Sequence, residues 1–456
     1  MNKNKADFGT GSMPKLILKQ ALPLALSQVA QLLYNIVDRI YIGHIEEESI
    51  APLTGLGLTF PIISAILAFT LLFGQGGCPI FSINRGKGDI DKASRIMGNS
   101  FTLLTISGVI LTLLVSILAK PLLYALGAGP ESFPYAYSYL RIYVLGTIFV
   151  MIGTGMNLYI TAQGSPITAM ITTMSGAVLN LILDPIFIFT LNLGIRGAAI
   201  ATLISQVVSF LWVMRFFLPG FGGKAVIPLS RKSMHLEPSI VGSIVAMGFT
   251  GFVMEITNSL TQVVCNRTLK FYGGEMYVGI MTIVNSVRSI MGVAVNGIVQ
   301  GAQPVLGFNY GAKKYDRVLS GIRYSCMFAF VYTAFAWAVV FFFPGFFIGL
   351  FSDDAVTNAV AVPYLHIFFM AYVFMSLQFS GQSTFMALGK AKRAIFFSLF
   401  RKVILVVPLT ILLPRVMTDA VSGVFYAEPI SNVIGGAASF TAMYFTIYRK
   451  LARKQS

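Results

Sequence analysis

The 456-residue sequence predicts an all-α polytopic membrane protein, with twelve transmembrane helices in two six-helix bundles that form a parallel pseudo-repeat. The first observation is composition: 56% of the residues are hydrophobic, only 11% are charged, and the mean hydropathy is +0.77. A soluble domain carries about 25% charged residues. The second observation is that apolar stretches of about 20 residues, long enough to span a bilayer, recur from end to end. The third is a match between the two halves of the chain.

The apolar stretches begin with a helix that we expect to be retained. Its run is longer than the apolar core of a signal peptide, which is about 7–15 residues. Little sequence remains between the stretches for a soluble domain. The predicted spans are 16–42, 54–83, 97–119, 135–162, 167–191, 198–219, 240–270, 278–307, 319–349, 360–388, 394–413 and 423–448.

Catalytic and metal-binding motifs are absent from the sequence. Cys78, Cys265 and Cys326 are widely spaced and form no CxxC or Cys/His cluster, so neither a disulfide framework nor a zinc site is indicated. The sequence also lacks the GxxxxGK[ST] loop of ATP-driven proteins and the HExxH and GxSxG motifs of hydrolases. We therefore expect no enzymatic activity, and no cofactor apart from a coupling ion.

The net charge of +16 is concentrated in alternate inter-helix segments and at the two ends. Most of the 33 Lys and Arg lie at Lys3, Lys5, Lys15, Lys19, 84–95, Arg215 to Lys232, Lys313 to Arg323, Lys390 to Lys402 and 449–454. The intervening loops hold Glu46, Glu47, Glu48, Glu131, Glu275, Asp353, Asp354 and Asp419. This positive-inside bias predicts that both termini are cytoplasmic. The basic charge is thus a topology signal, and no nucleic-acid partner is expected.

An internal repeat relates the two halves at an offset of 225 residues. "GGCPIFSINRGKGDIDKA" (76–93) aligns with "GAQPVLGFNYGAKKYDRV" (301–318), with identities at Gly76/Gly301, Pro79/Pro304, Asn84/Asn309, Gly86/Gly311 and Asp91/Asp316. We predict an N-terminal lobe at 1–217, a cytoplasmic linker at 218–238 and a C-terminal lobe at 239–456. Six spans return the chain to its starting side, so the lobes share an orientation, as in parallel-repeat transporters. The repeat favours a transporter over a receptor or a membrane enzyme.

Four acids lie inside predicted spans: Asp38, Asp184, Glu255 and Glu428. Each costs about 2.5–3.5 kcal/mol at a helix centre on insertion scales, and is a functional candidate by default. The predicted topology places Asp38, Asp184 and Thr202 at one depth, in the outer-leaflet part of the first lobe. Asn180 precedes Asp184 by four residues and so lies on the same helix face. These oxygens could bind Na⁺, or one carboxyl could hold a proton, because burial beside a like charge favours the neutral acid.

Two features around Asp184 have alternative explanations. The carboxylate could instead form a structural ion pair inside the bundle, with Arg141 or Arg196. Pro185 removes the backbone donor to the Leu181 carbonyl and favours a bend. That bend could be a hinge beside a cavity, where irregular backbone is tolerated, or a static kink.

The acids of the second lobe are open to more than one interpretation. Glu255 has Asn258, Ser259 and Gln262 on or near its helix face, which makes a polar stripe. It could contact a cationic substrate or act as a second protonation site. Glu428 precedes Pro429 near the outer end of the last span and could simply reach the membrane interface.

The sequence resembles the multidrug and toxic compound extrusion (MATE) family over essentially its whole length. The residues that carry the resemblance are "YNIVDRIYIGHI" in the first span, "LNLILDPIFIF" in the fifth, "GIRGAAIATLISQ" (194–206) and the paired "NRGKGDIDKA" and "NYGAKKYDRV" loops. The "NxxxDP" form is similar to prokaryotic branches that include multidrug pumps of Gram-positive bacteria. The resemblance implies a V-shaped pair of six-helix bundles that alternates between outward-open and inward-open states.

By position, the resemblance implies that Asp38, Asn180, Asp184 and Thr202 form the cation-coupling site. Glu255 departs in its spacing from the acid that some branches carry in the seventh helix. The position paired with Asp184 in the second half is Leu409. Cation coupling is therefore expected in the N-terminal half alone.

The function expected from this resemblance is multidrug efflux by antiport with Na⁺ or H⁺, giving xenobiotic transport and antibiotic resistance. The expected partners are small-molecule drugs and membrane lipid, and the protein is expected to be a monomer in the cell inner membrane. The alternative is a flippase for lipid-linked saccharides. Flippases usually carry basic residues in their cavity for phosphate groups, and here Arg288 and Arg267 are the main cations within the spans.

Overall fold

The computed structural model describes residues 7–43, 45, 51–351 and 355–454. Within these ranges the structure is helical, with no strand. The loop acids Glu46, Glu47, Glu48, Asp353 and Asp354 and the terminal Lys3 and Lys5 lie outside the described residues. The α-helices are α1 Met13–Gly43, α2 Ala51–Gly86, α3 Ile90–Ala125, α4 Phe133–Tyr143, α5 Thr147–Ala162, α6 Pro166–Pro185, α7 Gly194–Phe217, α8 Pro238–Gly273, α9 Glu275–Gly311, α10 Tyr315–Phe342, α11 Pro344–Gly349, α12 Ala355–Phe369, α13 Met375–Ala387, α14 Ala391–Leu399, α15 Val407–Val416, α16 Ala420–Met443 and α17 Arg449–Ala452.

Shorter 3₁₀ and π segments interrupt or join these helices. The 3₁₀ segments are η1 Val144–Gly146, η3 Pro219–Phe221, η4 Arg231–Met234 and η5 Tyr372–Phe374. The π segments are η2 Ile186–Thr190, η6 Phe400–Val406 and η7 Tyr444–Tyr448.

The predicted transmembrane architecture is confirmed. Among the described residues, eleven helical segments are long and apolar enough to cross a membrane, and a bent pair at Asn358–Phe369 and Tyr372–Ala387 raises the count to twelve. One predicted span was too long at its end. The ninth, 319–349, breaks at Phe343, and α11 begins at Pro344, because proline favours the first turn of a new helix and cannot continue the old one.

The repeat is visible in the turns that end α2 and α9. The side-chain amide of Asn84 donates to the carbonyl four residues earlier at 2.8 Å, and so does that of Asn309, also at 2.8 Å. Four residues beyond each asparagine the backbone is left-handed, with φ of 79° at Gly88 and 58° at Lys313. Glycine adopts this conformation freely, whereas lysine rarely does. The two halves therefore share one turn geometry even where their side chains differ.

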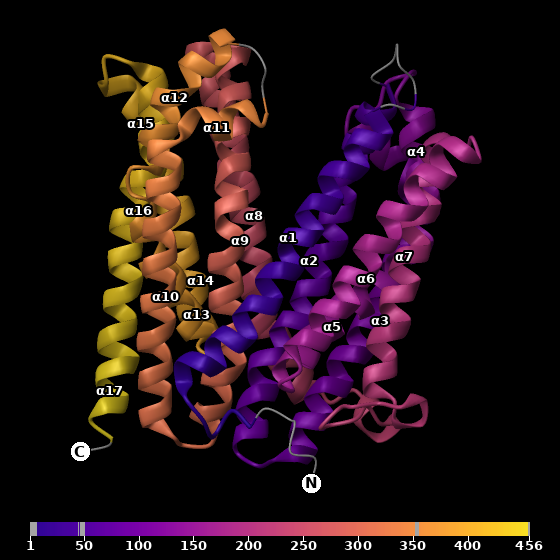
Figure 1. The fold of residues 1–456 in the computed structure, drawn as a ribbon, viewed down its shortest axis with the longest axis vertical. Helices are drawn as coiled ribbons and strands as arrows, with labels where there is room; N and C mark the ends of the chain where they lie inside the picture. Colours follow the sequence, from indigo (N-terminus) through magenta and orange to yellow (C-terminus); the bar gives the residue numbers. More distant parts are fainter. Residues whose placement is uncertain (1–6, 44, 46–50, 352–354, 455–456) are drawn as a thin grey trace. The chain divides into compact units, whose positions relative to one another are not determined.

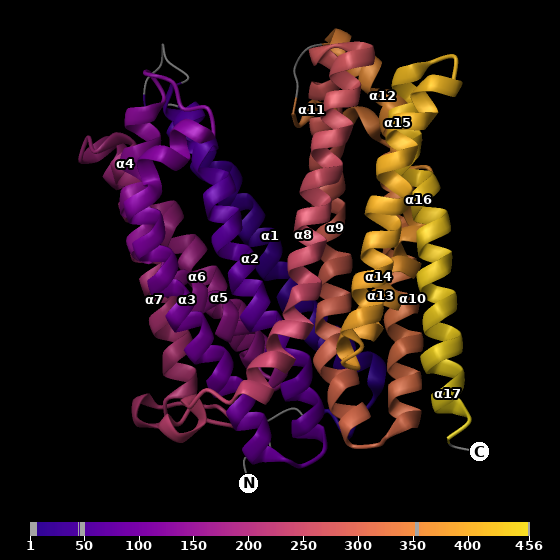
Figure 2. The same ribbon diagram turned by 180° about the vertical axis from the view of Figure 1, so that it is seen from behind.

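The described helices group into two compact units. The first contains Leu26–Gly248 together with Asp7, and the second contains Phe8–Ala25 and Phe249 to the last described residue. Figures 1 and 2 show α2 to α7 of the first unit in indigo to magenta and α10 to α17 of the second in orange to yellow. Two segments group differently from the predicted bounds: residues 8–25 of the predicted N-terminal lobe belong to the second unit, and residues 239–248 of the predicted C-terminal lobe belong to the first. The predicted linker 218–238 also groups with the first unit.

Close helix contacts build the core of the first unit. Tyr159 on α5 is fully buried, packs edge-on against Phe81 at 5.3 Å between ring centroids, and donates to the Ser100 hydroxyl at 2.6 Å. A Cβ placed on Gly74 would lie 2.7 Å from Gly155 Cα. Glycine is thus required where α2 and α5 approach backbone to backbone.

The segment between α7 and α8 is docked onto the first unit by hydrogen bonds. The side chain of Gln163 donates to the carbonyl of Ile227 at 3.1 Å and accepts from its N–H at 2.9 Å. Asn99 on α3 donates to the carbonyl of His235 at 2.8 Å and accepts from the Glu237 N–H at 2.9 Å. The predicted linker 218–238 is therefore held in place along the ends of α3 and α5.

The start of the chain is held to the second unit through α9 and α10. Arg317 donates to the carbonyls of Phe8, Thr10 and Gly11 at 3.1, 3.0 and 2.8 Å. Its Nε also donates to the Asn309 side chain at 3.0 Å. These bonds hold residues 8–11 to the second unit, with which residues 8–25, including the first half of α1, are grouped.

Candidate functional site

A buried polar cluster lies in the first unit, where four helices each contribute two side chains one turn apart. The pairs are Tyr34 and Asp38 on α1, Tyr139 and Tyr143 on α4, Asn180 and Asp184 on α6, and Thr202 and Gln206 on α7. Residues at i and i+4 share a helix face, so each pair presents both side chains in one direction. The cluster contains all four predicted coupling residues, and their sites are buried: Asp38 is 6% exposed, Asn180 2%, Asp184 0% and Thr202 2%.

Asp184 is the most deeply buried acid of this cluster. Among the described residues, neither of its carboxylate oxygens accepts a hydrogen bond, and no Lys, Arg or His forms a salt bridge with it. The ion pair with Arg141 or Arg196 that the sequence allowed is therefore not formed. The neighbours that interact most strongly with Asp184 are the carboxyl of Asp38 and the amide of Asn180.

The hydroxyl of Thr202 connects the other members of the cluster. It accepts a hydrogen bond from the Asn180 side-chain amide at 3.3 Å. The hydroxyls of Tyr34 and Tyr139 lie within hydrogen-bond reach of the same oxygen. Donating its N–H to Thr202 leaves the Asn180 side-chain oxygen without a described partner.

This arrangement suits a small cation or a proton. Two carboxyls, an amide oxygen and a hydroxyl offer the oxygen ligands that hard cations prefer. Two buried acids in contact cannot both stay ionised without a compensating charge, so one could instead hold a proton. No group of three or more His, Cys, Asp or Glu gathers anywhere in the described part of the chain, and a site for a transition metal is not indicated.

Pro185 ends α6 directly after Asp184. The five residues that follow, η2, are wound as a π-helix. Proline removes one backbone donor, and π-helical turns are rare and are frequently found at functional sites. The irregular backbone that the sequence predicted is thus present beside the acid, and its role as a hinge stays a prediction.

Glu255 lies apart from the acidic cluster of the first unit. It is on α8 in the second unit, its side chain is exposed, and it forms no salt bridge with a described residue. Of the polar stripe predicted around it, Asn258 and Gln262 face a cavity in the second unit, which Glu255 does not line.

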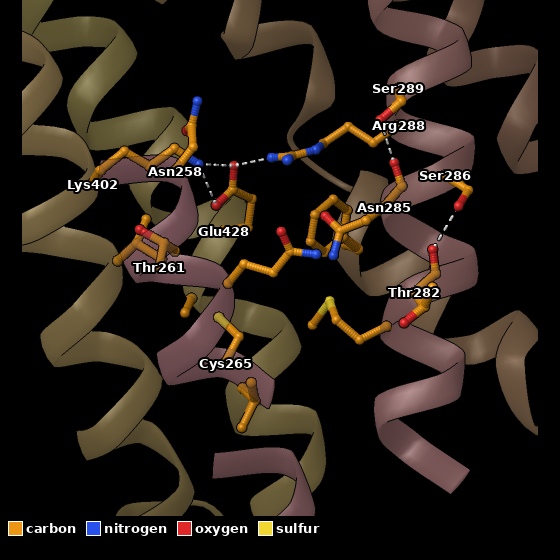
Figure 3. Close-up of a pocket in the computed structure, with 16 residues that line it drawn as sticks. Asn258, Thr261, Cys265, Thr282, Asn285, Ser286, Arg288, Ser289, Lys402 and Glu428 are labelled. Atoms are coloured by element: carbon orange, nitrogen blue, oxygen red, sulfur yellow. Dashed lines mark hydrogen bonds and ion pairs between the residues drawn. The ribbon is translucent and has the colours of Figure 1, made fainter. Parts of the chain in front are cut away.

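Glu428 does not reach the membrane interface as the sequence allowed. It is 6% exposed, and its carboxylate binds Arg401 at 3.1 Å. It also binds Arg288 at 3.1 Å and Lys402 at 3.2 Å (Figure 3). Counting Lys402 with the inter-helix charges was therefore wrong. It is 5% exposed and lies in η6, inside the span Ala391–Val416, where a carboxylate from α16 compensates its charge.

Sequence reasoning missed several members of both clusters. Arg401 and Lys402 lie inside the predicted span 394–413, and two charges well within an apolar run were a signal that could have identified them. Tyr34 precedes Asp38 by one helical turn, so the same spacing rule that linked Asn180 to Asp184 would have linked this pair. Nothing in the sequence links Tyr139 to the two acids, because only the tertiary packing of α4 places it near them.

The comparisons with known proteins agree with this architecture. A model of the MatE family matches residues 23–186 and 250–412, once in each half of the chain. Multidrug export protein MepA of Staphylococcus saprophyticus is 25% identical over 437 residues, covering 96% of this chain and 95% of that protein. The protein of the same name from Staphylococcus haemolyticus is 26% identical over 445 residues, covering 96% and 94%.

Solved structures share the fold at lower identity. A multidrug resistance MATE family transporter of the MOP superfamily, in an outward-facing conformation, has a TM-score of 0.92 and 23% identity, covering 99% of this chain and 100% of that chain. A MOP superfamily transporter from Pyrococcus furiosus has a TM-score of 0.91 and 22% identity, covering 100% of both chains. The prediction of a transporter rather than an enzyme is confirmed. The chain belongs to the MatE family, and it is a multi-pass membrane protein.

Proposed function

We propose that the protein is a secondary active exporter of amphipathic, cationic compounds, coupled to the inward movement of Na⁺ or H⁺ through alternating access. Support comes from the relatives that match nearly the whole chain and are named multidrug export proteins. The family membership also supports it. In this proposal the protein acts as a monomer, with both termini in the cytoplasm.

The observation that carries the proposal is the pair of buried acids, Asp38 and Asp184. The idealised cost of moving one carboxylate from water into a low-dielectric interior is of order 20 kcal/mol, and several kcal/mol remain after relaxation. No described Lys, Arg or His forms a salt bridge with Asp184 to offset this cost, and its neighbouring Asn180 amide is neutral. A bound Na⁺ or proton would offset it, so occupancy of the site is linked to the conformation that buries it.

Coupling follows if the site exchanges its cation with only one side of the membrane in each state. A ligand shifts a conformational equilibrium only through its different affinity for the two states. Asp184 supplies such a difference because its charge is tolerated only where water or a cation reaches it. Export of the drug then draws on the cation gradient and requires no ATP, consistent with the absence of a nucleotide-binding loop in the sequence.

The test is transport of rhodamine 6G, a fluorescent cationic dye, in proteoliposomes under imposed Na⁺ or pH gradients. We expect one gradient to drive dye movement and Asp184→Asn to reduce the driven rate at least tenfold. Dye binding at equilibrium should change little. Glu131→Gln is the matched control, since Glu131 is an exposed acid between α3 and α4. If neither gradient drives transport, or if Asp184→Asn remains fully coupled, antiport through this site is refuted.

One observation favours the second candidate, a flippase for lipid-linked saccharides. Arg288, Arg401 and Lys402 gather around a single acid, and a lipid-linked saccharide carries phosphate groups that would seek such cations. Translocation of a fluorescent lipid-linked saccharide between vesicle leaflets tests it. Flipping without gradient-driven dye transport would favour the flippase.

A further inference from the structure

A cavity of about 250 Å³ lies within the second unit, beside the Glu428 cluster. Figure 3 shows Arg288 from α9 and Lys402 from η6 approaching the Glu428 carboxylate from opposite sides. Side chains from α8 and α9, including Asn258 and Asn285, line the rest of its polar wall. The cavity is distinct from the acidic cluster of the first unit and shares no residue with it.

The charge around this cavity is positive. Three cations surround one carboxylate, and no other Asp or Glu lines the cavity in the described part of the chain. Arginine is not deprotonated in proteins, so Arg288 and Arg401 outweigh Glu428 whatever the state of Lys402. Buried charges need a partner, and the protein supplies one negative charge for two or three positive ones.

The cations around Glu428 differ in their other hydrogen-bond partners and in their exposure to the cavity. Arg401 also donates to the Asn432 side chain at 2.8 Å and does not line the cavity. Arg288 does line it, its side chain is 27% exposed, and its described hydrogen bond is a single one to Glu428. A guanidinium has five N–H donors, which leaves Arg288 able to bind a second anion at the cavity surface.

Neutral donors surround the same space. The side-chain amides of Asn258, Gln262 and Asn285 line the cavity and form no hydrogen bond with another described residue. Each amide offers two N–H groups. An oxyanion placed beside Arg288 would therefore meet charged and neutral donors together, the combination that gives the strongest hydrogen bonds.

We propose that this cavity binds an oxyanion group, a carboxylate or a phosphate, carried by an amphipathic compound. The proposal rests on the proposed export function and extends its substrates to compounds that bear an acidic group. The apolar side chains of Met281, Phe368, Val406 and Val424 also line the cavity and would contact the apolar body next to that group. Ligand pockets for drug-sized compounds are about 300–1,000 Å³, so this cavity accommodates the acidic end of a compound rather than all of it.

The test uses two dyes that differ at one group. Rhodamine 19 is a free carboxylic acid, and rhodamine 6G is its ethyl ester. We expect purified full-length protein to bind rhodamine 19 about tenfold more tightly, by fluorescence anisotropy. Arg288→Gln should remove this preference and leave rhodamine 6G affinity within about twofold. Lys402→Gln is a second variant in which Glu428 keeps two cationic partners, so a folding defect in one variant does not decide the result.

Competition identifies the source of the anionic group. Displacement of rhodamine 19 by benzoate assigns the site to organic carboxylates. Displacement by inorganic phosphate, or by phosphatidic acid in nanodiscs, assigns it to a free or lipid-borne phosphate. The proposal is supported only if this displacement is absent in the Arg288→Gln variant. Equal displacement by chloride at the same ionic strength, or an undiminished preference in both variants, would overturn it.

The two proposals can fail separately. Asp184→Asn should abolish gradient-driven transport and retain the preference for rhodamine 19. If neither gradient drives rhodamine 6G transport, the proposed export function is refuted. The equilibrium binding measurements then still decide whether the cavity binds an oxyanion.

Discussion

Replacing Glu428 with Gln should destabilise the second unit strongly. The carboxylate lies 3.1, 3.1 and 3.2 Å from its three cationic partners. At an effective dielectric constant of about 20, each contact contributes roughly 5 kcal/mol of attraction before desolvation is subtracted. Removing one partner of a buried ion pair costs about 3–5 kcal/mol net, because the remaining charge is left uncompensated. Here three cations would be left together, so we expect a loss at the upper end of that range.

The expected loss can be measured as a thermal shift. For a unit of 150–250 residues, each kcal/mol corresponds to about 2–4 °C in Tm, so a loss of about 5 kcal/mol gives a decrease of about 10–20 °C. The chain has two tryptophans, of which Trp212 lies on α7 in the first unit and Trp337 on α10 in the second. Intrinsic fluorescence of the detergent-purified protein in a Trp212→Phe background therefore reports on the unit that holds Glu428.

A compensating substitution tests the electrostatic origin of the loss. In the Glu428→Gln background, Lys402→Met removes one of the unpaired cations and fills its volume with an apolar side chain. We expect at least half of the lost Tm to return. A shift of less than 2 °C in Glu428→Gln, or a further decrease in the double variant, would refute the view that charge imbalance governs this cluster.

Two further predictions concern packing in the first unit. A Cβ at Gly248 would lie 1.7 Å from the Leu72 carbonyl oxygen, whereas one at Gly242 on the same helix meets nothing within 4 Å. Gly248→Ala should therefore lower Tm by several degrees. Gly242→Ala should leave Tm unchanged or raise it, since alanine stabilises a helix by about 1 kcal/mol relative to glycine. Equal Tm shifts in the two variants would contradict the close approach of Gly248 to Leu72. Gln163→Ala removes both hydrogen bonds to Ile227, so we expect faster proteolysis between residues 218 and 238. An unchanged cleavage rate would show that these hydrogen bonds do not hold the segment in place.

Much of the fold could be predicted because each span is a local property of the sequence. Hydropathy and length identified the helices, and the repeated Asn–Gly turn identified the duplication. The docking of 218–238 could not be predicted, since it depends on Gln163 and Asn99, which give no sign in the sequence that their partners lie in the linker. Hydropathy alone also could not show that the ninth span ends in a separate short helix, because residues 334–349, on both sides of the break, are apolar.

The acidic cluster was predicted from the sequence, and the basic one was missed although two of its charges lie within a predicted span. Asp38 and Asp184 are isolated acids in apolar helices, so their cost is visible locally. Lys402 follows the basic residues that begin at Lys390 closely in the sequence. The positive-inside rule therefore counted it with the charges of an inter-helix segment. Its burial is tolerated because Glu428, on another helix, forms an ion pair with it. This ion pair depends on the tertiary structure and cannot be read from the local sequence.

The repeat shows how the two clusters came to differ in sign. At an offset of 226, Glu428 on α16 is the counterpart of Thr202 on α7, and Gly423 is the counterpart of Gly197. A Cβ on Gly197 would lie 2.5 Å from the carbonyl oxygen of the preceding span, and one on Gly423 3.1 Å from the corresponding oxygen, so both helix pairs pack by the same close approach. On this shared backbone, the first unit has a hydroxyl where the second has a carboxylate. The first unit places its acids on α1 and α6 without described basic partners for Asp184, and the second surrounds its acid with bases. On one shared backbone geometry, the two units thus carry buried side-chain clusters of opposite sign.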